Sequence, residues 1–280
     1  MPSSFWSNTI WFILLGIATA FELIFIFTKV QKPKLVLALY LTVAGLAFAI
    51  ELSVFASFNA YQYFPKIIPS SPYDDSVAAN LFSQFSIAAT ALLIAVYNLK
   101  YYWYIIFAGA YGLIEELFIK LGIYKHNWYR TWMTIVGLLI LFWMVKKIYT
   151  GSIKQISRIW RYIYIFLGLI TLHAHLLWIF RLSKIFAFGE NFYAVEGSKI
   201  TPIASIYHLV VGGTIIALYF LKISWWWKAT IALLLLAAHY FGYYFHLMIF
   251  KPGWLIPVSV FSILSIYLFI YFLDKLFDQA

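Results

Sequence analysis

Apolar residues follow one another along this chain in long runs, and short polar segments separate the runs. Nine runs reach about 20 residues, the length that a helix needs to cross a bilayer. The pattern predicts nine transmembrane helices at about residues 9–28, 35–58, 76–98, 101–120, 131–149, 159–181, 202–221, 225–248 and 254–273. The third run has the most polar start.

The composition indicates that the bilayer is the solvent. Of the 280 residues, 64% are hydrophobic and 11% are charged, whereas soluble domains carry about 25% charged residues. No linker or low-complexity segment divides the chain, and no internal repeat is evident in the sequence. We therefore expect a single integral membrane domain over residues 1–280, built as an all-α helix bundle.

The charge distribution predicts an orientation. The net charge is +10, and the basic residues lie between the apolar runs, which is typical of membrane topology and not of a nucleic-acid surface. Twelve of the 20 lysines and arginines fall on one side if the N-terminus is outside. We therefore expect a multi-pass protein of the cell membrane, in contact with membrane lipids, with its N-terminus outside.

Several ionisable residues interrupt the predicted helices. Such groups are costly within a bilayer and usually face a protein interior or a wet cavity. Counting about 1.5 Å per helical residue places most of them about 7–13 Å below the outer face. The layer holds Glu51, Glu115, His173, His175, His208 and His239, with His246 nearer the surface. Five of the nine predicted helices contribute to it, so we expect one polar site in the outer leaflet.

Two adjacent acids end the fourth predicted helix, in the stretch IEELFIKLGIYKHNWYRTW. Glu116 and Lys120 have the i, i+4 spacing of a helical ion pair. Glu115 points about 100° away from Glu116 on a helix and needs another partner, for which the intramembrane histidines are candidates. If the site is catalytic, Glu115 and Glu116 are its candidate acids and bases.

The histidines allow three interpretations. Neutral imidazoles bind divalent metals, and three protein ligands with a water form a catalytic zinc site. His173 or His175, with His208, His239 and Glu115, could therefore hold zinc or another divalent metal. Alternatively, the rings form hydrogen bonds with tyrosine, threonine or carbonyl groups between packed helices. The third possibility is a proton or substrate pathway.

Basic residues gather in the segment after residue 120. Lys125, His126 and Arg130 are candidates for binding an anionic lipid headgroup or a phosphate, and the alternative is anchoring at the membrane interface. Arg181 and Lys184 allow the same two roles. The absence of cysteine excludes disulfides, thiol chemistry and thiolate metal sites.

Two resemblances rest on this region. The run Glu115-Glu116-Leu-Phe-Ile-Lys120 resembles the EExxxR motif of the CAAX-processing and bacteriocin-processing membrane metalloproteases. That resemblance implies hydrolysis within the membrane, although lysine replaces arginine and neither FxxxH nor HxxxN occurs in the chain. The stretch IEELFIKLGIYKHNWYRTW also resembles a segment of uncharacterised polytopic membrane proteins from spore-forming Gram-positive bacteria, which implies no activity.

The sequence thus favours a membrane protein with an outer-leaflet Glu/His site. Our first hypothesis is a metal-dependent enzyme that acts on a lipid-like or membrane-embedded substrate, in which the metal activates water and Glu115 shuttles the proton. The alternatives are a proton-coupled carrier or channel and a structural or accessory membrane subunit without chemistry.

Overall fold

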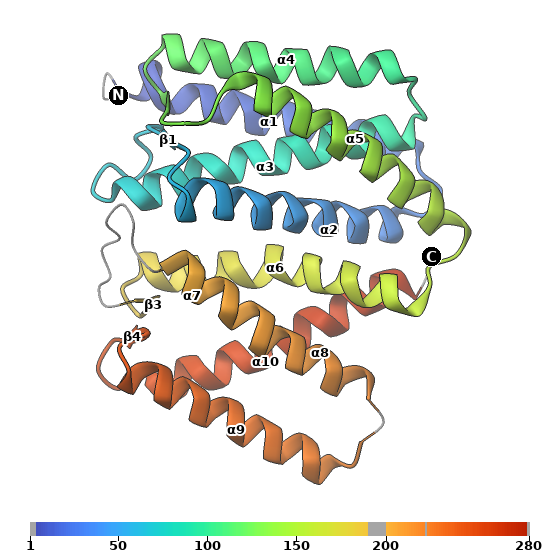
Figure 1. Ribbon diagram of the computed structural model, residues 1–280. Helices are drawn as coiled ribbons and strands as arrows, with labels where there is room; N and C mark the ends of the chain where they lie inside the picture. The colour runs from blue at the N-terminus through green and yellow to red at the C-terminus, as the bar shows by residue number, and fades with distance from the viewer. Residues whose placement is uncertain (1–3, 190–199, 222, 279–280) are drawn as a thin grey trace.

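Helices make up most of the structure (Figure 1), a computed structural model that describes residues 4–189, 200–221 and 223–278. The long helices are α1 (Ile10–Lys29), α2 (Pro33–Leu52), α3 (Pro72–Val96), α4 (Tyr101–Lys120), α5 (Thr131–Lys154), α6 (Arg158–Leu182), α9 (Trp225–Tyr244) and α10 (Leu255–Phe277). The helices α7 (Ile200–Tyr207) and α8 (Gly213–Phe220) form one further span through a π-helical turn, His208–Gly212. Each expected apolar run therefore contains a helix.

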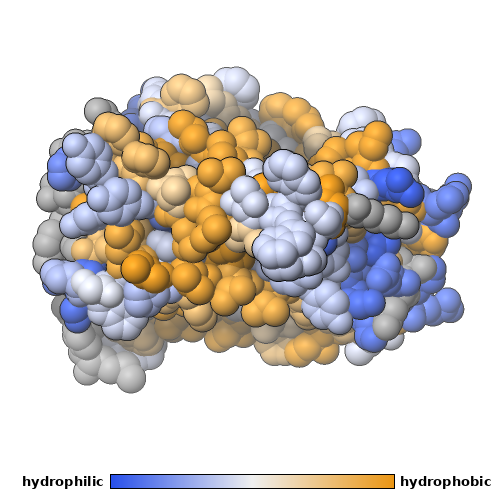
Figure 2. All heavy atoms as spheres, turned by 90° about the horizontal axis from the view of Figure 1, so that it is seen from below, coloured by the Kyte–Doolittle hydropathy of each residue, from blue (hydrophilic) through white to orange (hydrophobic). Residues whose placement is uncertain are grey.

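The helices have the length and composition of membrane spans. Within the described ranges, 8 helical segments are long and apolar enough to cross a bilayer. Helix α9 is also 20 residues long, but its tryptophan, tyrosine and histidine residues lower its mean hydropathy. Figure 2 shows an apolar band across the middle of one face, with hydrophilic residues gathered at one end. The prediction of an all-α, multi-pass membrane bundle is confirmed, and the inside–outside orientation stays a prediction.

Short strand pairs, which the sequence analysis did not predict, join the helices at one end of the bundle. Strand β1 (Tyr61–Tyr63) pairs antiparallel with β2 (Tyr124–His126), so that Tyr61 lies opposite His126. Strand β3 (Phe186–Phe188) pairs antiparallel with β4 (Met248–Phe250). The labelled strands lie at the same end of the molecule in Figure 1, which we call the strand end.

The chain contains an internal repeat that its sequence does not reveal. The order helix, strand, helix, helix, strand, helix runs from α2 to α5 and again from α6 to α10. A spacing of 124 residues relates the starts of α4 and α9, of β2 and β4, and of α5 and α10. The backbone φ is positive before β2 at Gly122 and before β4 at His246, again 124 residues apart. The two halves therefore share one topology, and α1 precedes the first half.

The halves meet where α2 packs against α6. The Thr171 hydroxyl donates to the carbonyl of Leu41 at 2.8 Å, and the Thr42 hydroxyl donates to that of Tyr164 at 3.1 Å. Near these bonds the helices approach so closely that a Cβ on Gly45 would lie 1.8 Å from the carbonyl oxygen of Leu167. Only glycine fits at this crossing.

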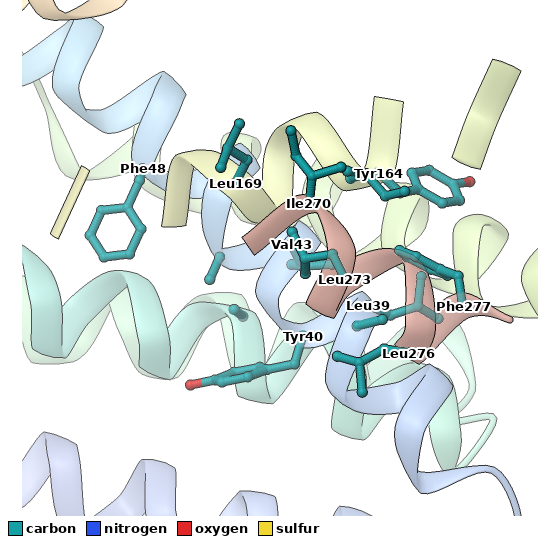
Figure 3. Packing of buried hydrophobic residues seen from close by; sticks show 14 of the residues in the cluster. Leu39, Tyr40, Val43, Phe48, Tyr164, Leu169, Ile270, Leu273, Leu276 and Phe277 are labelled. Carbon is teal, nitrogen blue, oxygen red and sulfur yellow. The ribbon is translucent and has the colours of Figure 1, made fainter. Parts of the chain in front are cut away.

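One apolar core extends across this interface. Figure 3 shows side chains of α2, α6 and α10 packed together, all of them buried, including Leu39, Tyr164 and Ile270. Burial of this apolar surface ties α10 of the second half to α2 of the first. The core therefore belongs to both halves.

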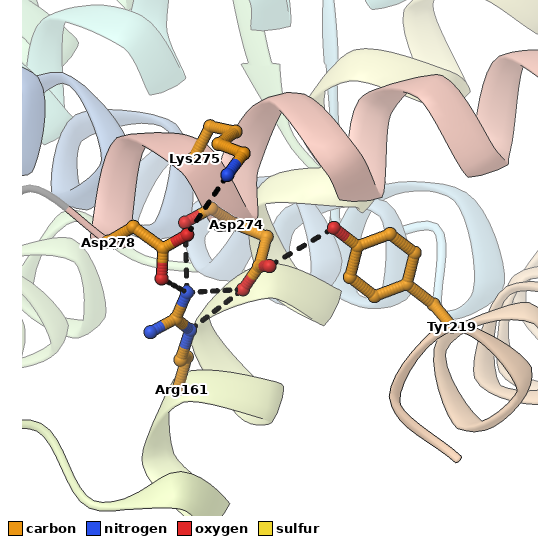
Figure 4. Close-up of polar contacts among 5 residues, drawn as sticks. All are labelled: Arg161, Tyr219, Asp274, Lys275 and Asp278. Carbon is orange, nitrogen blue, oxygen red and sulfur yellow. Dashed lines mark hydrogen bonds and ion pairs between the residues drawn. The ribbon is translucent and has the colours of Figure 1, made fainter. Parts of the chain in front are cut away.

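An ionic cluster fastens α6 to α10 at the opposite end of the bundle (Figure 4). The Arg161 guanidinium donates from Nε to Asp274 Oδ1 at 2.8 Å and also pairs with Asp278. Tyr219 donates to Asp274 Oδ2 at 3.1 Å. The hydrogen bond from Arg161 holds the pKa of the Asp278 carboxyl below its ordinary value.

Candidate functional sites

Each half holds a polar cluster close to its strand pair. In the first half the cluster centres on Glu115 of α4, and in the second on His239 of α9. These two residues are equivalent, because each lies 14 residues after the first residue of its helix. The structure therefore replaces the single expected site with two sites of different chemistry.

The first-half cluster surrounds the Glu115 carboxylate. His126 Nε2 lies 2.7 Å from Glu115 Oε1, and the Thr134 hydroxyl donates to Oε2 at 2.5 Å. The side chains of Glu115 and His126 are only 11% and 14% exposed. Strand β2 brings His126 back over the end of α4. The partner of Glu115 is therefore a histidine of its own half, not one of the intramembrane histidines that the sequence suggested.

A cavity of about 210 Å³ adjoins Glu115. Its walls include Glu51 of α2, Tyr111 of α4 and four tyrosines outside the long helices, which are Tyr61, Tyr63, Tyr124 and Tyr129. Burial raises the pKa of the Tyr129 phenol to about 12, and burial likewise raises the pKa values of Tyr61, Tyr63 and Tyr124. These phenols therefore stay neutral and present hydroxyl donors and ring faces to the cavity.

The other acids and bases of this stretch do not join the cluster. The Glu116 carboxylate accepts a 2.5 Å hydrogen bond from Thr131, and the expected ion pair with Lys120 does not form among the described residues. Arg130 donates to the carbonyls of Asn127 and Tyr129, and Lys125 is exposed. Because Glu115 engages His126, the expected anion site of Lys125, His126 and Arg130 does not assemble as one group.

The second-half cluster is a chain of five buried side chains from four helical segments. His208 Nε2 lies 3.2 Å from His173 Nδ1, and His173 Nε2 lies 3.0 Å from the Ser262 hydroxyl. The chain continues from Ser262 to the Tyr207 hydroxyl at 2.6 Å and from there to His239 Nε2 at 3.1 Å. His173 is fully buried. The chain contains no carboxylate, and all five of its side chains are buried.

The direction of its outer hydrogen bonds is fixed by the backbone. His208 Nδ1 donates to the carbonyl of Ala204 at 2.7 Å, and His239 Nδ1 donates to that of Leu235 at 2.8 Å. In a neutral ring the other nitrogen is then an acceptor. His173 must therefore donate from Nδ1 to His208, which leaves His173 Nε2 as an acceptor too.

The neutral chain is consequently one hydrogen short. Three contacts connect the acceptor nitrogens of His173 and His239 through Ser262 and Tyr207. Only two hydrogens, those of the serine and tyrosine hydroxyls, are available to fill them. One contact always lacks a hydrogen, and leaving a buried polar group without a partner costs about 1–3 kcal/mol. One added proton completes all three contacts.

The predicted convergence of histidines is therefore confirmed in part. His173, His208 and His239 lie in one network, but His173 and His239 meet through Ser262 and Tyr207, and Glu115 belongs to the other half. His175 bonds to the carbonyl of Thr171 and packs against Phe48 and Phe85. His246 is exposed in the turn before β4.

The metal site that the sequence suggested finds no support. Among the described residues, no group of three or more histidine, aspartate or glutamate side chains is arranged to hold a metal ion. In the histidine chain, the ring nitrogens of His173 face His208 and Ser262, and Nδ1 of His208 and of His239 faces a carbonyl. These histidines instead form hydrogen bonds with one another, with hydroxyl groups of neighbouring helices and with carbonyl groups, which is one of the alternative interpretations of the sequence.

An ion pair between the halves was not foreseen. Arg181 of α6 donates from Nε to Asp74 Oδ1 of α3 at 2.9 Å, and Trp178 donates to the same oxygen at 3.1 Å. Asp74 and Arg181 are each about 6% exposed in their side chains. Their separation of 107 residues in the sequence left no pattern to detect.

A smaller network holds Glu22 of α1. Thr90 donates to the Glu22 carboxylate at 2.8 Å, and its hydroxyl lies 2.8 Å from that of Tyr111. Ser86 lies 2.8 Å from the same tyrosine hydroxyl. Glu22 therefore pairs with polar groups of α3 and α4 and helps to attach α1 to the bundle.

Comparison with known proteins adds no assignment, because no protein-family model, curated protein or solved structure matches the chain. Function must therefore be inferred from the chemistry of the sites themselves.

Proposed function

We propose that this chain is a proton-coupled carrier of the cell membrane, with the histidine chain of the second half as its proton relay. The observation that carries the proposal is the hydrogen shortage between His173 and His239. A relay needs donors and acceptors in continuous contact and a position that accepts one more proton. The chain from His173 through Ser262 and Tyr207 to His239 meets both requirements.

The two hydroxyl hydrogens can fill two of the three contacts in three ways. One way leaves the contact between the two hydroxyls without a hydrogen, and each of the other two leaves the contact of one histidine without a hydrogen. In one of these last two arrangements, Tyr207 donates to Ser262, and Ser262 donates to His173. In the other, Ser262 donates to Tyr207, and Tyr207 donates to His239. A proton that arrives at one histidine and leaves from the other converts one arrangement into the other. The relay therefore passes a net proton without moving any heavy atom far.

The architecture supports a carrier over an enzyme. Several carrier folds consist of parallel repeats related by an axis along the membrane normal, with the substrate site at the repeat interface. Here the two halves repeat the same helix order, and a mainly apolar cavity with a few polar side chains lies at their junction. The π-helical turn at His208 supports the same view, because such turns often mark functional sites.

A metal-dependent enzyme, our first hypothesis, is less well supported. Metal-activated hydrolysis requires ligands that leave an open coordination position for water, and the described part of the chain provides no such ligand set. The Glu115 and His126 pair could exchange a proton with a bound molecule, but it faces a tyrosine-lined cavity without an activated nucleophile.

Transport in proteoliposomes tests the proposal. Purified protein would be reconstituted with a trapped pH-sensitive dye, and pools of amino acids, organic acids and amines would be added outside under a proton gradient. We expect at least one pool to elicit proton movement that Tyr207→Phe and Ser262→Ala reduce about tenfold or more. Each change removes one relay hydroxyl and keeps the approximate shape of the side chain.

Ser265→Ala is the matched control. Ser265 lies on the same helix and is buried, but its hydroxyl donates to the Ser262 carbonyl and takes no part in the relay. We expect this variant to move protons like the wild type. Proton movement that is equal in Tyr207→Phe and wild type, or absent with every pool, contradicts the proposed function.

A further inference from the structure

A second cavity lies at the junction of the two halves. It has a volume of about 100 Å³, and its walls come from α2, α3, α6 and α7, from β3 and from the π-helical turn that begins at His208. Apolar side chains form most of the wall, among them Phe48, Leu177 and Phe188. The polar groups in the wall include Glu51, Asn80 and Arg181. The cavity is thus an apolar chamber with a few fixed polar groups, the usual form of a small-molecule site.

The Arg181 guanidinium is only partly used by the protein. Its Nε donates to Asp74, whereas Nη1 and Nη2 are buried and have no hydrogen-bond partner among the described residues. Both polar atoms of the Asn80 side chain are likewise buried and unpartnered. Arg181 is 6% exposed and Asn80 is 1% exposed. Buried polar groups in native proteins are nearly always hydrogen-bonded, so these donors indicate a ligand.

An acidic side chain lies elsewhere in the same wall. Glu51 Oε1 is buried and also lacks a hydrogen-bond partner in the described chain. Glu51 and Arg181 form no ion pair with each other, although both line the cavity. The cavity therefore presents a cation and an acid that a molecule between them could join.

We propose that this cavity binds a small zwitterion with an apolar body, in the manner of a hydrophobic α-amino acid. Its carboxylate accepts from the free edge of the Arg181 guanidinium, which suits bidentate recognition of a carboxylate, and from the Asn80 amide. Its ammonium group donates to Glu51. Its side chain lies against the apolar wall formed by residues such as Phe48 and Leu177.

The cavity volume limits the size of the ligand. An apolar cavity of about 150 Å³ accommodates benzene, so about 100 Å³ suits an apolar body no larger than a short branched chain. The isobutyl side chain of leucine, which has four carbon atoms where benzene has six, meets this limit. A membrane lipid, whose acyl chains are far longer, does not fit inside.

This inference rests on the proposed function only in naming the substrate of the carrier. Binding to the purified protein is measurable without transport, so the two proposals can fail separately. Binding of the zwitterion without any transport of it overturns the carrier and leaves the site. Proton-coupled transport of another solute that the zwitterion does not inhibit overturns the site and leaves the carrier.

Three matched probes test the site by titration calorimetry on the whole protein in nanodiscs. Leucine carries a carboxylate and an ammonium group, 3-methylbutylamine lacks the carboxylate, and 4-methylpentanoate lacks the ammonium group. We expect leucine to bind about tenfold or more tightly than either analogue, because each analogue leaves polar atoms of Arg181 or Glu51 without a partner. Equal binding of leucine and either analogue, or binding of none, overturns the proposal.

Two variants locate the binding within this cavity. Arg181→Lys keeps the charge beside Asp74 but loses the guanidinium edge, and Asn80→Ala removes an amide without stranding a charge. We expect each to weaken leucine binding about tenfold. Ser152→Ala is the control, since Ser152 Oγ is also buried and unpartnered but lies outside the cavity. Unchanged affinity in Asn80→Ala, or an equal loss in Ser152→Ala, refutes the assignment.

Discussion

Equivalent positions in the two halves carry different titratable side chains, and each side chain has found a partner within its own half. Glu115 pairs with His126, whereas His239 pairs with Tyr207. Sequence reasoning placed both residues in one outer-leaflet layer, and the structure places them at equivalent positions of α4 and α9. Depth along a helix says nothing about direction around the bundle axis, so it could not separate one cluster from two.

At the scale of single residues, we expect Glu115 and His126 to be energetically coupled. Glu115→Gln and His126→Phe should each cost about 1–3 kcal/mol, because each leaves a nearly buried partner without its hydrogen bond. The double variant should be less destabilised than the sum of the two by about 0.5–3 kcal/mol. Thermal or denaturant unfolding in detergent measures the free energy of unfolding of the wild type, the two single variants and the double variant.

The neighbouring acid provides the comparison. Glu116 is exposed and accepts from Thr131, so Glu116→Gln should change the free energy of unfolding by no more than about 0.5 kcal/mol. Its effect should add to that of Lys120→Met, since no ion pair joins the two residues in the described structure. In contrast, additive effects of Glu115→Gln and His126→Phe on the free energy of unfolding would contradict the observed pair.

At the scale of elements, the apolar runs predicted the helices well because a spanning helix must bury about 20 consecutive residues in lipid. The strand pairs escaped prediction because each strand has only 3 residues, too few for an alternating pattern to emerge. The repeat escaped because its halves share backbone topology and spacing but differ in side chains, as Glu115 and His239 illustrate.

The contact between α2 and α6 gives a prediction at this scale. Gly45→Ala should cost about 1–3 kcal/mol or more, because the new Cβ would meet the rigid carbonyl of Leu167 and force the helices apart. Gly109→Ala is the control, since no atom lies within 4 Å of its added Cβ. Unfolding in detergent should show a large loss for the first variant and none for the second.

At the scale of the whole molecule, the two polar clusters and the cavity between the halves lie toward the strand end. Composition alone could establish the bilayer as solvent, but which end faces outward depends on the lysine and arginine bias. Glu190, Glu196 and Lys199 of the expected outer loop lie outside the described residues. The orientation therefore needs a chemical test.

Cysteine labelling provides that test, because the chain has no cysteine of its own. Lys125 in β2 and Gln155 after α5 are both exposed and lie in segments between spans. We expect Lys125→Cys to react with a membrane-impermeant maleimide in intact cells, and Gln155→Cys to react only after permeabilisation. The opposite labelling pattern would show that the strand end faces the cytoplasm.

The crossing at Gly45 also determines how one half can move against the other. The backbone of α2 at Gly45 contacts the carbonyl of Leu167 in α6. If α2 slid along its axis against α6, residues larger than glycine would collide with that carbonyl. Tilting about the crossing leaves the contact in place, so Gly45 acts as a pivot. A tilt that widens the gap between α2 and α6 at one membrane face must narrow it at the other.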